Sequence, residues 1–295
     1  MKKKGSQGER IFDVVNIIGL TLLMVITFYP VVYVIMASLS DSNRLLSYTG
    51  LLIKPLGLST SAYKAVIKNP NIMSGYIVTL CVVICGTFLN ILATSVSAFV
   101  LTRKRFPLRK IFTLFAIFTM YFSGGMIPRY LFINDTLELG NSLWVLVLPG
   151  MISTYNLIIM KSNFESIPDS LEESARIDGA NDIVILFRII LPLSKAILAV
   201  MVLMYGVNHW NAWFDAMLFI RDRNRYPLQI ILREILIANS TDSMMSGAGT
   251  GADVEAIGES IKYATIVITT APILCIYPFV QKYFTKGVML GAVKG

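Results

Sequence analysis

A cluster of polar and aromatic residues between positions 208 and 213 combines side-chain types that could bind a solute. It contains Asn208, Trp210, Asn211 and Trp213, with His209 among them. Sugars stack on aromatic faces and form hydrogen bonds with amides, so the cluster could be the outer rim of a saccharide path. The same residues also fit an aromatic belt at a membrane surface. The sequence leaves both interpretations open.

Catalytic, metal-binding and nucleotide-binding chemistry finds little support in the sequence. His209 has no set of carboxylates or cysteines around it that would indicate a metal site or a catalytic base. Cys81, Cys85 and Cys275 lie in apolar runs without metal or disulfide spacing. The Gly-rich stretch 246–251 lacks the lysine of a P-loop, and no G-x-x-x-x-G-K-[ST] motif occurs. We therefore expect a chain that is not an enzyme and that binds no metal or cofactor.

The apolar residues are arranged in long runs without charge. Hydrophobic residues make up 55% of the 295 residues and charged residues 15%, compared with about 25% charged residues in soluble domains. A membrane-spanning helix needs roughly 20 apolar residues. Six runs approach or exceed this length: 14–40, 69–102, 111–128, 139–160, 196–214 and 263–281. We expect an all-α, polytopic membrane protein with six transmembrane helices.

The basic residues predict how these six helices are oriented. With the N-terminus in the cytoplasm, 16 of the 26 lysines and arginines fall in cytoplasmic segments, including the cluster Arg103-Lys104-Arg105. This bias follows the positive-inside rule and places both termini in the cytoplasm. It also explains the net charge of +8 without a nucleic-acid partner. We interpret the cluster as a tight cytoplasmic turn that could touch anionic lipid.

The predicted spans divide the chain into three parts. Residues 1–70 form a cytoplasmic N-terminal segment, the first helix and an external loop; residues 71–290 form a transmembrane domain with five helices; residues 291–295 form a cytoplasmic tail. The second run contains polar residues, which in lipid normally face other helices. These residues predict a central position for the second helix: Asn90, Thr94, Ser95 and Ser97.

A charged segment, residues 163–192, separates the fourth and fifth runs. Pro168 suits the start of a helix, and Asp169 and Glu172 have the spacing of a capping pair. Glu172 and Arg176 are spaced for an ion pair between successive turns. The sequence therefore predicts a short helix on the cytoplasmic surface.

The same segment predicts a break and a second helix. Gly179 is suited to end the first helix, and Asn181-Asp182 can cap a second helix that runs from Ile183 toward Leu191. Small residues on the first helix would allow it to sit in a cleft of another protein. An ordinary amphipathic connecting loop is the alternative.

The segment resembles a known motif. Glu173-Ser174-Ala175, Gly179 and Ile189-Ile190-Leu191-Pro192 match the E-A-A-x3-G-x9-I-x-L-P loop of permease subunits of binding-protein-dependent ABC importers, with Ser174 in place of the first alanine. Residues 171–180 are similar to the version found in carbohydrate permeases. The ending 291–295 resembles that of maltose-permease-like subunits, and residues 122–128 resemble the branch for complex oligosaccharides, including uronate-containing ones.

This resemblance implies a permease subunit of an ATP-driven importer of sugars, such as oligosaccharides, in a bacterial cell membrane. It implies four kinds of partner: a cytosolic ATPase dimer that uses ATP and Mg²⁺, a second homologous permease, an extracytoplasmic solute-binding protein, and the lipid bilayer. It assigns contact with the ATPase to Leu171, Glu172, Glu173, Ser174, Ala175, Arg176, Asp178, Gly179 and Ala180. It assigns docking of the tail near the ATPase interface to Gly291, Ala292, Val293, Lys294 and Gly295.

An ion-coupled secondary transporter of a small polar solute is the alternative function. Such a transporter would normally place ionisable residues inside its spans. The six runs contain none apart from His209 near an end. Transport by this chain alone would favour the alternative.

Overall fold

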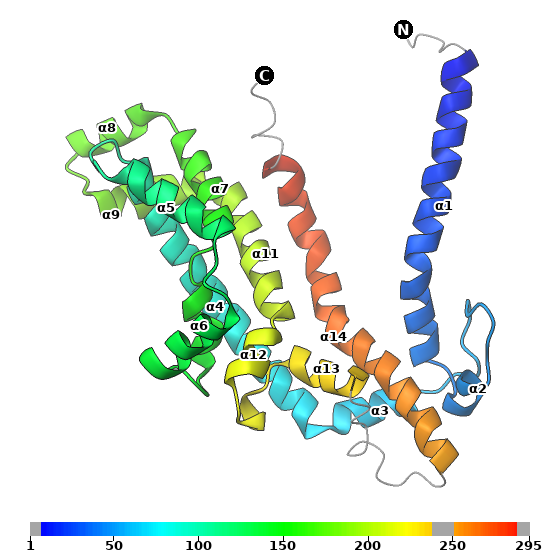
Figure 1. The fold of residues 1–295 in the computed structure, drawn as a ribbon. Coiled ribbons are helices and arrows are strands. Elements are labelled where there is room, and N and C mark those ends of the chain that lie inside the picture. Colours follow the sequence, from blue (N-terminus) through cyan, green and yellow to red (C-terminus); the bar gives the residue numbers. More distant parts are fainter. Residues whose placement is uncertain (1–6, 238–250, 288–295) are drawn as a thin grey trace. The chain divides into compact units, whose positions relative to one another are not determined.

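The computed structural model describes residues 7–237 and 251–287, and the regular elements in these residues are helices (Figure 1). The predicted tail, residues 291–295, lies outside the described residues. Three helices are long and apolar enough to cross a membrane, at Ile11–Ser38, Pro70–Thr102 and Gly258–Ile276, and three bent helix pairs would raise the number to six. The all-α class is therefore confirmed, whereas six spans stay a prediction.

One compact unit combines the described parts of Met1–Asn69 and Glu234–Thr270. It contains α1 (Gln7–Ser38), α2 (Ser42–Leu46), α3 (Ser61–Lys68) and the first part of α14 (Gly251–Gly287). Ala37, Leu45 and Leu52 form a small core, against which Tyr33 and Tyr263 pack edge to face with their ring centroids 5.7 Å apart. The apolar side chains of α1 from Ile11 to Phe28 are exposed within the chain. They therefore suit contact with lipid or with another membrane helix.

The second unit, which comprises the described parts of Pro70–Arg233 and Ala271–Gly295, is built around α4 (Pro70–Thr102). In Figure 1, α4 lies beside α7 (Thr154–Glu165) and α11 (Lys195–Asn211), and both helices pack against it. Asn90, Thr94 and Ser95 are buried and Ser97 is partly buried, so the predicted central position of this helix is confirmed. The remaining helices that begin in this unit are α5 (Arg109–Tyr121), α6 (Met126–Leu131), η1 (Phe132–Thr136), η2 (Leu143–Leu146), η3 (Leu148–Gly150), α8 (Asp169–Ile177), α9 (Asp182–Ile185), η4 (Leu186–Ile190), α10 (Leu191–Leu193), α12 (Phe214–Phe219), η5 (Arg223–Arg225) and α13 (Leu228–Ile237).

The apolar runs 111–128 and 139–160 are each interrupted by a bend. The helical segments Arg109–Tyr121 and Met126–Thr136 meet at 116°, and Leu143–Gly150 meets Thr154–Glu165 at 51°. In the first run, Gly125 has a φ of +85°, a conformation that a right-handed helix cannot contain. In the second, two short 3₁₀ turns around Pro149 precede the helix.

The side chain of Asn90 stabilises the bend in the 139–160 run. Its Nδ2 donates hydrogen bonds to the carbonyls of Gly150 (3.0 Å) and Met151 (2.8 Å), and its Oδ1 lies 2.8 Å from Nε2 of His209. A bend leaves carbonyls without helical partners, and an unpaired carbonyl in apolar surroundings is costly. Asn90 supplies the missing donors and connects α4 to both neighbours.

Tyr205 of α11 makes a second connection at the same level. Its hydroxyl lies 2.7 Å from Oγ1 of Thr94 and accepts a hydrogen bond from the backbone N–H of Ser153 (3.1 Å). Ser153 is the N-cap residue of α7. Both sides of the break between η3 and α7 are therefore held by side chains from α4 and α11.

The close approach of α11 to α4 requires a glycine at position 86. A Cβ atom added to Gly86 would lie 2.7 Å from Nε2 of His209 and no more than 3.0 Å from two other ring atoms. Because the imidazole would have to move away from Asn90, we expect Gly86→Ala to cost about 1–3 kcal/mol of stability. The melting temperature of the detergent-solubilised variant, determined by size-exclusion chromatography after heating, is compared with that of the parent.

Gly19→Ala in α1 is the matched control, because a Cβ there meets no atom of the described residues within 4 Å. Alanine favours a helix over glycine by about 1 kcal/mol, so the control is expected to melt no earlier than the parent. Equal melting of the two variants would contradict the packing of His209 on Gly86.

Candidate functional site

The predicted partner-binding helix is α8, which lies with α9 at the end of the second unit where α4 finishes (Figure 1). The predicted glycine break is confirmed, because Gly179 has a φ of +83°. The N–H of Ala180 donates to the carbonyl of Ala175 (2.9 Å), and the N–H of Gly179 donates to that of Arg176 (3.1 Å). These two bonds are the Schellman arrangement that closes a helix.

The predicted cap of the second helix is also confirmed. Asn181 is the N-cap residue of α9, and its Oδ1 accepts a hydrogen bond from the N–H of Val184 at 2.9 Å. The helix does not run uniformly to Leu191, however, because a π-helical turn, η4, follows α9 and leads into α10. Ile185, Leu186 and Ile190 are buried in the main core of this unit. A π turn inserts one extra residue and so changes which side chains face inward.

The capping pair and the ion pair predicted within α8 do not form. Pro168 occupies the N-cap position, and no side chain among the described residues caps the helix. Glu172 forms an ion pair with Arg103, and Arg176 forms one with Asp182. The side chains of Arg103 and Glu172 are only 18% and 13% exposed. A largely buried pair of this kind is screened less by solvent than an exposed pair between successive helical turns, which contributes only about 0.3–0.5 kcal/mol.

Two basic residues beyond the end of α4 hold α8 in place. The Arg103 guanidinium lies 4.1 Å from the ring centroid of Phe99 while it pairs with Glu172. Lys104 Nζ lies 2.7 Å from Oδ2 of Asp169. The hydrogen bond between the two side chains lowers the pKa of Asp169 and raises the pKa of Lys104. Both groups therefore stay charged at neutral pH. Because this second pair is exposed, the pair of Arg103 and Glu172 is the stronger anchor.

This anchoring role was missed by the sequence analysis, which interpreted the basic cluster as a turn. A signal was available: the acidic residues of segment 163–192 and the basic residues of 103–105 were predicted on the same side of the membrane. Opposite charges in two neighbouring loops indicate contact between them, although periodicity along a single helix cannot reveal it.

The nine residues of 171–180 that the resemblance assigns to ATPase contact fall into two groups. Ala175 and Ala180 pack against the chain's own core, and Glu172 and Arg176 are paired within the chain. The other five are exposed: Leu171, Glu173, Ser174, Asp178 and Gly179. The inward group therefore positions α8, and the exposed group presents an outward surface.

Ile177, which the sequence analysis did not single out, is the most exposed apolar residue of α8. Its exposure is 87%, compared with 43% for Leu171. Ser170, Ser174 and Ile177 are spaced four and three residues apart, so they share one face of the helix. An exposed isoleucine at the end of a helix face that otherwise carries two serines is suited to enter a pocket of another protein.

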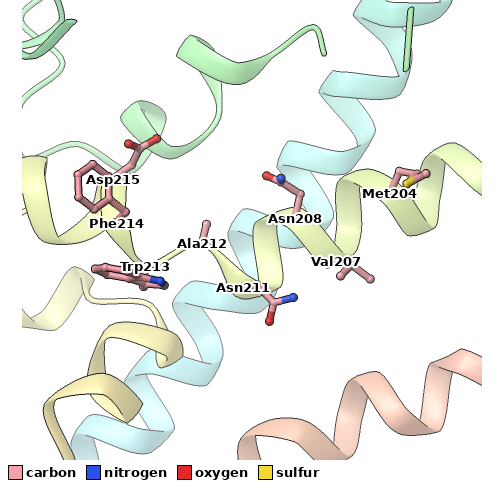
Figure 2. Close-up of a pocket in the computed structure, with 8 residues that line it drawn as sticks. All are labelled: Met204, Val207, Asn208, Asn211, Ala212, Trp213, Phe214 and Asp215. Atoms are coloured by element: carbon pink, nitrogen blue, oxygen red, sulfur yellow. The ribbon is translucent and has the colours of Figure 1, made fainter. Parts of the chain in front are cut away.

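The polar and aromatic cluster lines a cavity of about 470 Å³ at the opposite end of α11 from α8 (Figures 1 and 2). The helix α11 ends at Asn211, and α12 begins at Phe214 after a two-residue break. Of the four candidate residues, three line the cavity: Asn208, Asn211 and Trp213. Trp210 is buried against Tyr76, with ring centroids 6.3 Å apart, and does not line the cavity.

Charged residues border this cavity and are already engaged. Asp215 lines it and accepts two hydrogen bonds from Arg129 of α6, at 2.8 and 2.7 Å. The Arg233 guanidinium lies 4.5 Å from the ring centroid of Trp213. Two amides and the indole face of Trp213 that Arg233 does not cover therefore remain as the groups that can receive a polar solute. His209 is occupied by its contact with Asn90.

The anchoring of α8 can be tested by removing one charge. We expect Glu172→Gln to destabilise α8 locally by about 1.5–3 kcal/mol, because Arg103 loses its charged acceptor. Hydrogen exchange of the amides of residues 169–178, followed by mass spectrometry, should accelerate by about tenfold or more. Glu173→Gln is the matched control, since Glu173 is exposed. Equal exchange in both variants would show that the ion pair does not hold the helix.

Comparisons with known proteins agree with this architecture. A family described as "Binding-protein-dependent transport system inner membrane component" matches residues 91–290. The chain is 39% identical over 288 residues to the polygalacturonan/rhamnogalacturonan transport system permease protein YtcP of Bacillus subtilis (strain 168), covering 97% of this chain and 99% of that one. It is also 39% identical over 290 residues to Protein LplC of the same organism, covering 98% and 97%.

A solved structure agrees as well. The crystal structure of a bacterial ABC transporter involved in the import of the acidic polysaccharide alginate contains a chain that matches with a TM-score of 0.86 and 29% identity, covering 95% of this chain and 99% of that chain. The multi-pass helical architecture and the matches over nearly the whole length lead to one conclusion. The chain belongs to the family of inner membrane components of binding-protein-dependent transport systems, and its relatives are permease subunits of carbohydrate ABC importers.

Proposed function

We propose that this chain is the membrane-spanning permease subunit of an ATP-driven oligosaccharide importer and that α8 couples ATP hydrolysis by a separate ATPase to solute movement. The observation that carries the proposal is the geometry of α8, whose inner side is fixed to the end of α4 and whose outer side is exposed. The ATPase dimer binds ATP and Mg²⁺, and this chain binds neither. A second homologous permease and an extracytoplasmic solute-binding protein complete the importer.

The path of coupling follows the contacts of α8. A displacement of α8 acts on α4 through Arg103 and on α11 through the continuous connection α9, η4 and α10. The helices α4 and α11 pack along each other and are joined by the hydrogen bond between Asn90 and His209. The cavity lined by Asn208 and Asn211 lies on α11. Movement at one end of this helix pair can therefore change the shape of the cavity at the other end.

The cavity supports an oligosaccharide as the solute. Trp213 offers an aromatic face, and Asn208 and Asn211 offer both hydrogen-bond donors and acceptors. Relatives are named for transport of polygalacturonan and rhamnogalacturonan and for import of alginate. Uronate-containing chains are therefore the class of solute that we favour.

The proposed topology has six spans with both termini in the cytoplasm and α8 on the cytoplasmic side. It divides the chain into residues 1–70, the transmembrane domain 71–290, and the tail 291–295. The tail is proposed to dock near the ATPase interface. In this proposal α8 supplies the main contact with the ATPase, and the tail supplies a separate, additional contact.

The contact with the ATPase can be tested at Ile177. We expect Ile177→Asp to weaken co-purification of the ATPase at least tenfold, because the substitution places a carboxylate in an apolar socket. ATP-driven uptake by the reconstituted importer should fall in parallel. Ile53→Asp is the matched control, since Ile53 is also exposed, at 69%, and lies in the proposed external loop. Normal assembly of the Ile177 variant would refute the role of α8, whatever the role of the cavity.

The solute path can be tested at Trp213. We expect Trp213→Ala to lower the maximal rate of oligosaccharide uptake about fivefold, because loss of an aromatic stacking face costs about 1 kcal/mol. Assembly with the ATPase should be unchanged. Trp144→Ala is the control, because Trp144 is exposed and does not line the cavity. An uptake rate equal to that of the control would remove Trp213 from the path.

A further inference from the structure

A second groove, distinct from the proposed solute path, lies between the last turns of α4 and the segment α9–η4. Its volume is about 530 Å³. Most of its wall is apolar, with Val96, Phe99 and Val100 on one side and Ile183 and Phe187 on the other. Val96, Val100, Ile183 and Phe187 are exposed within the chain. The groove is therefore an apolar surface that requires an occupant once α4 is in a membrane.

The charged side chains of this groove are predominantly basic. Three arginines, Arg103, Arg105 and Arg176, and a single carboxylate, Asp182, line it. Arg103 is paired with Glu172, and Arg176 is paired with Asp182. The side chain of Arg105 is exposed and has no ion pair or hydrogen bond with residues 7–237 or 251–287. Within the described part of the chain, Arg105 is therefore a cation without a partner beside an apolar groove.

The position of the groove indicates what kind of ligand it can accept. Residues 96–100 belong to the last turns of an apolar helix that is long enough to cross a bilayer, and Arg105 follows three residues after that helix ends. A side chain at such a position lies at the level of lipid headgroups, where basic residues attract anionic lipids. Acyl chains match the apolar wall, and a phosphate group matches the guanidinium of Arg105.

We propose that this groove binds an anionic phospholipid, with its phosphate on Arg105 and an acyl chain along Val96, Val100 and Phe187. The lipid fills the space between α4 and α9. It thereby supports the same end of α4 that carries Arg103 and anchors α8. This proposal requires that α4 crosses the bilayer and that no partner protein covers the groove, and it does not depend on the solute.

Quenching of tryptophan fluorescence by brominated lipids tests the proposal. Phe187→Trp places a reporter in the groove of the full importer reconstituted into vesicles, and the fluorescence of the parent importer is subtracted. Two kinds of vesicle are compared, and both contain equal mole fractions of phosphatidylglycerol and phosphatidylcholine. In one kind only the phosphatidylglycerol is dibrominated, and in the other only the phosphatidylcholine is. We expect phosphatidylglycerol to occupy the groove about fivefold more strongly, which is the preference that one basic residue gives at a membrane surface.

Two variants in the reporter background test the part played by the charge. Arg105→Gln should abolish the preference for phosphatidylglycerol, whereas Arg105→Lys should retain it. Equal quenching by both lipids would overturn the proposal in favour of ordinary bulk lipid, and absence of quenching would show that another protein covers the groove. ATP-driven uptake by the same vesicles, measured in parallel, separates a failure of this proposal from a failure of the proposed function.

Discussion

Backbone groups inside an apolar environment must find hydrogen-bond partners, and this constraint explains why Asn90 lies at the centre of the second unit. The chain bends before α7, where two carbonyls would otherwise have no donor. A single amide satisfies both and also contacts His209, so the bend, α4 and α11 are joined at one point. The bundle can therefore contain broken helices without exposing their backbone to lipid.

The contacts around Asn90 lie between the two ends of the second unit. At one end, the buried pair of Arg103 and Glu172 fixes α8 to α4. At the other, the break after Asn211 forms a cavity with amide and indole groups. The helices α4 and α11 extend between these ends, and the contacts of Asn90 and Tyr205 keep them together. This continuity is the physical basis for linking an event at α8 to the shape of the cavity.

Local signals in the sequence predicted local structure well. Gly179 ended a helix and Asn181 capped the next one because backbone conformation and capping depend on a few neighbouring residues. The buried polar residues of α4 were predicted from the cost of exposing them to lipid. The ion pair of Glu172 was predicted with the wrong partner, because Arg103 lies 69 positions before Glu172 in the sequence. Trp210 was grouped with the cavity residues for a related reason, since adjacent positions on a helix point in different directions.

The attachment of α8 to the turn after α4 also affects how such proteins can be recombined. A chimaera that exchanged only residues 163–192 with a related permease would replace Asp169 and Glu172 by the residues of the relative. The relative's own partners for these positions, which correspond to Arg103 and Lys104, would not be transferred. The exchanged helix would then keep its own sequence but lose its fixed position on the membrane body. The smallest unit that can be transplanted intact therefore comprises two segments, the turn at 103–104 and residues 169–182, which are separate in the chain and adjacent in space.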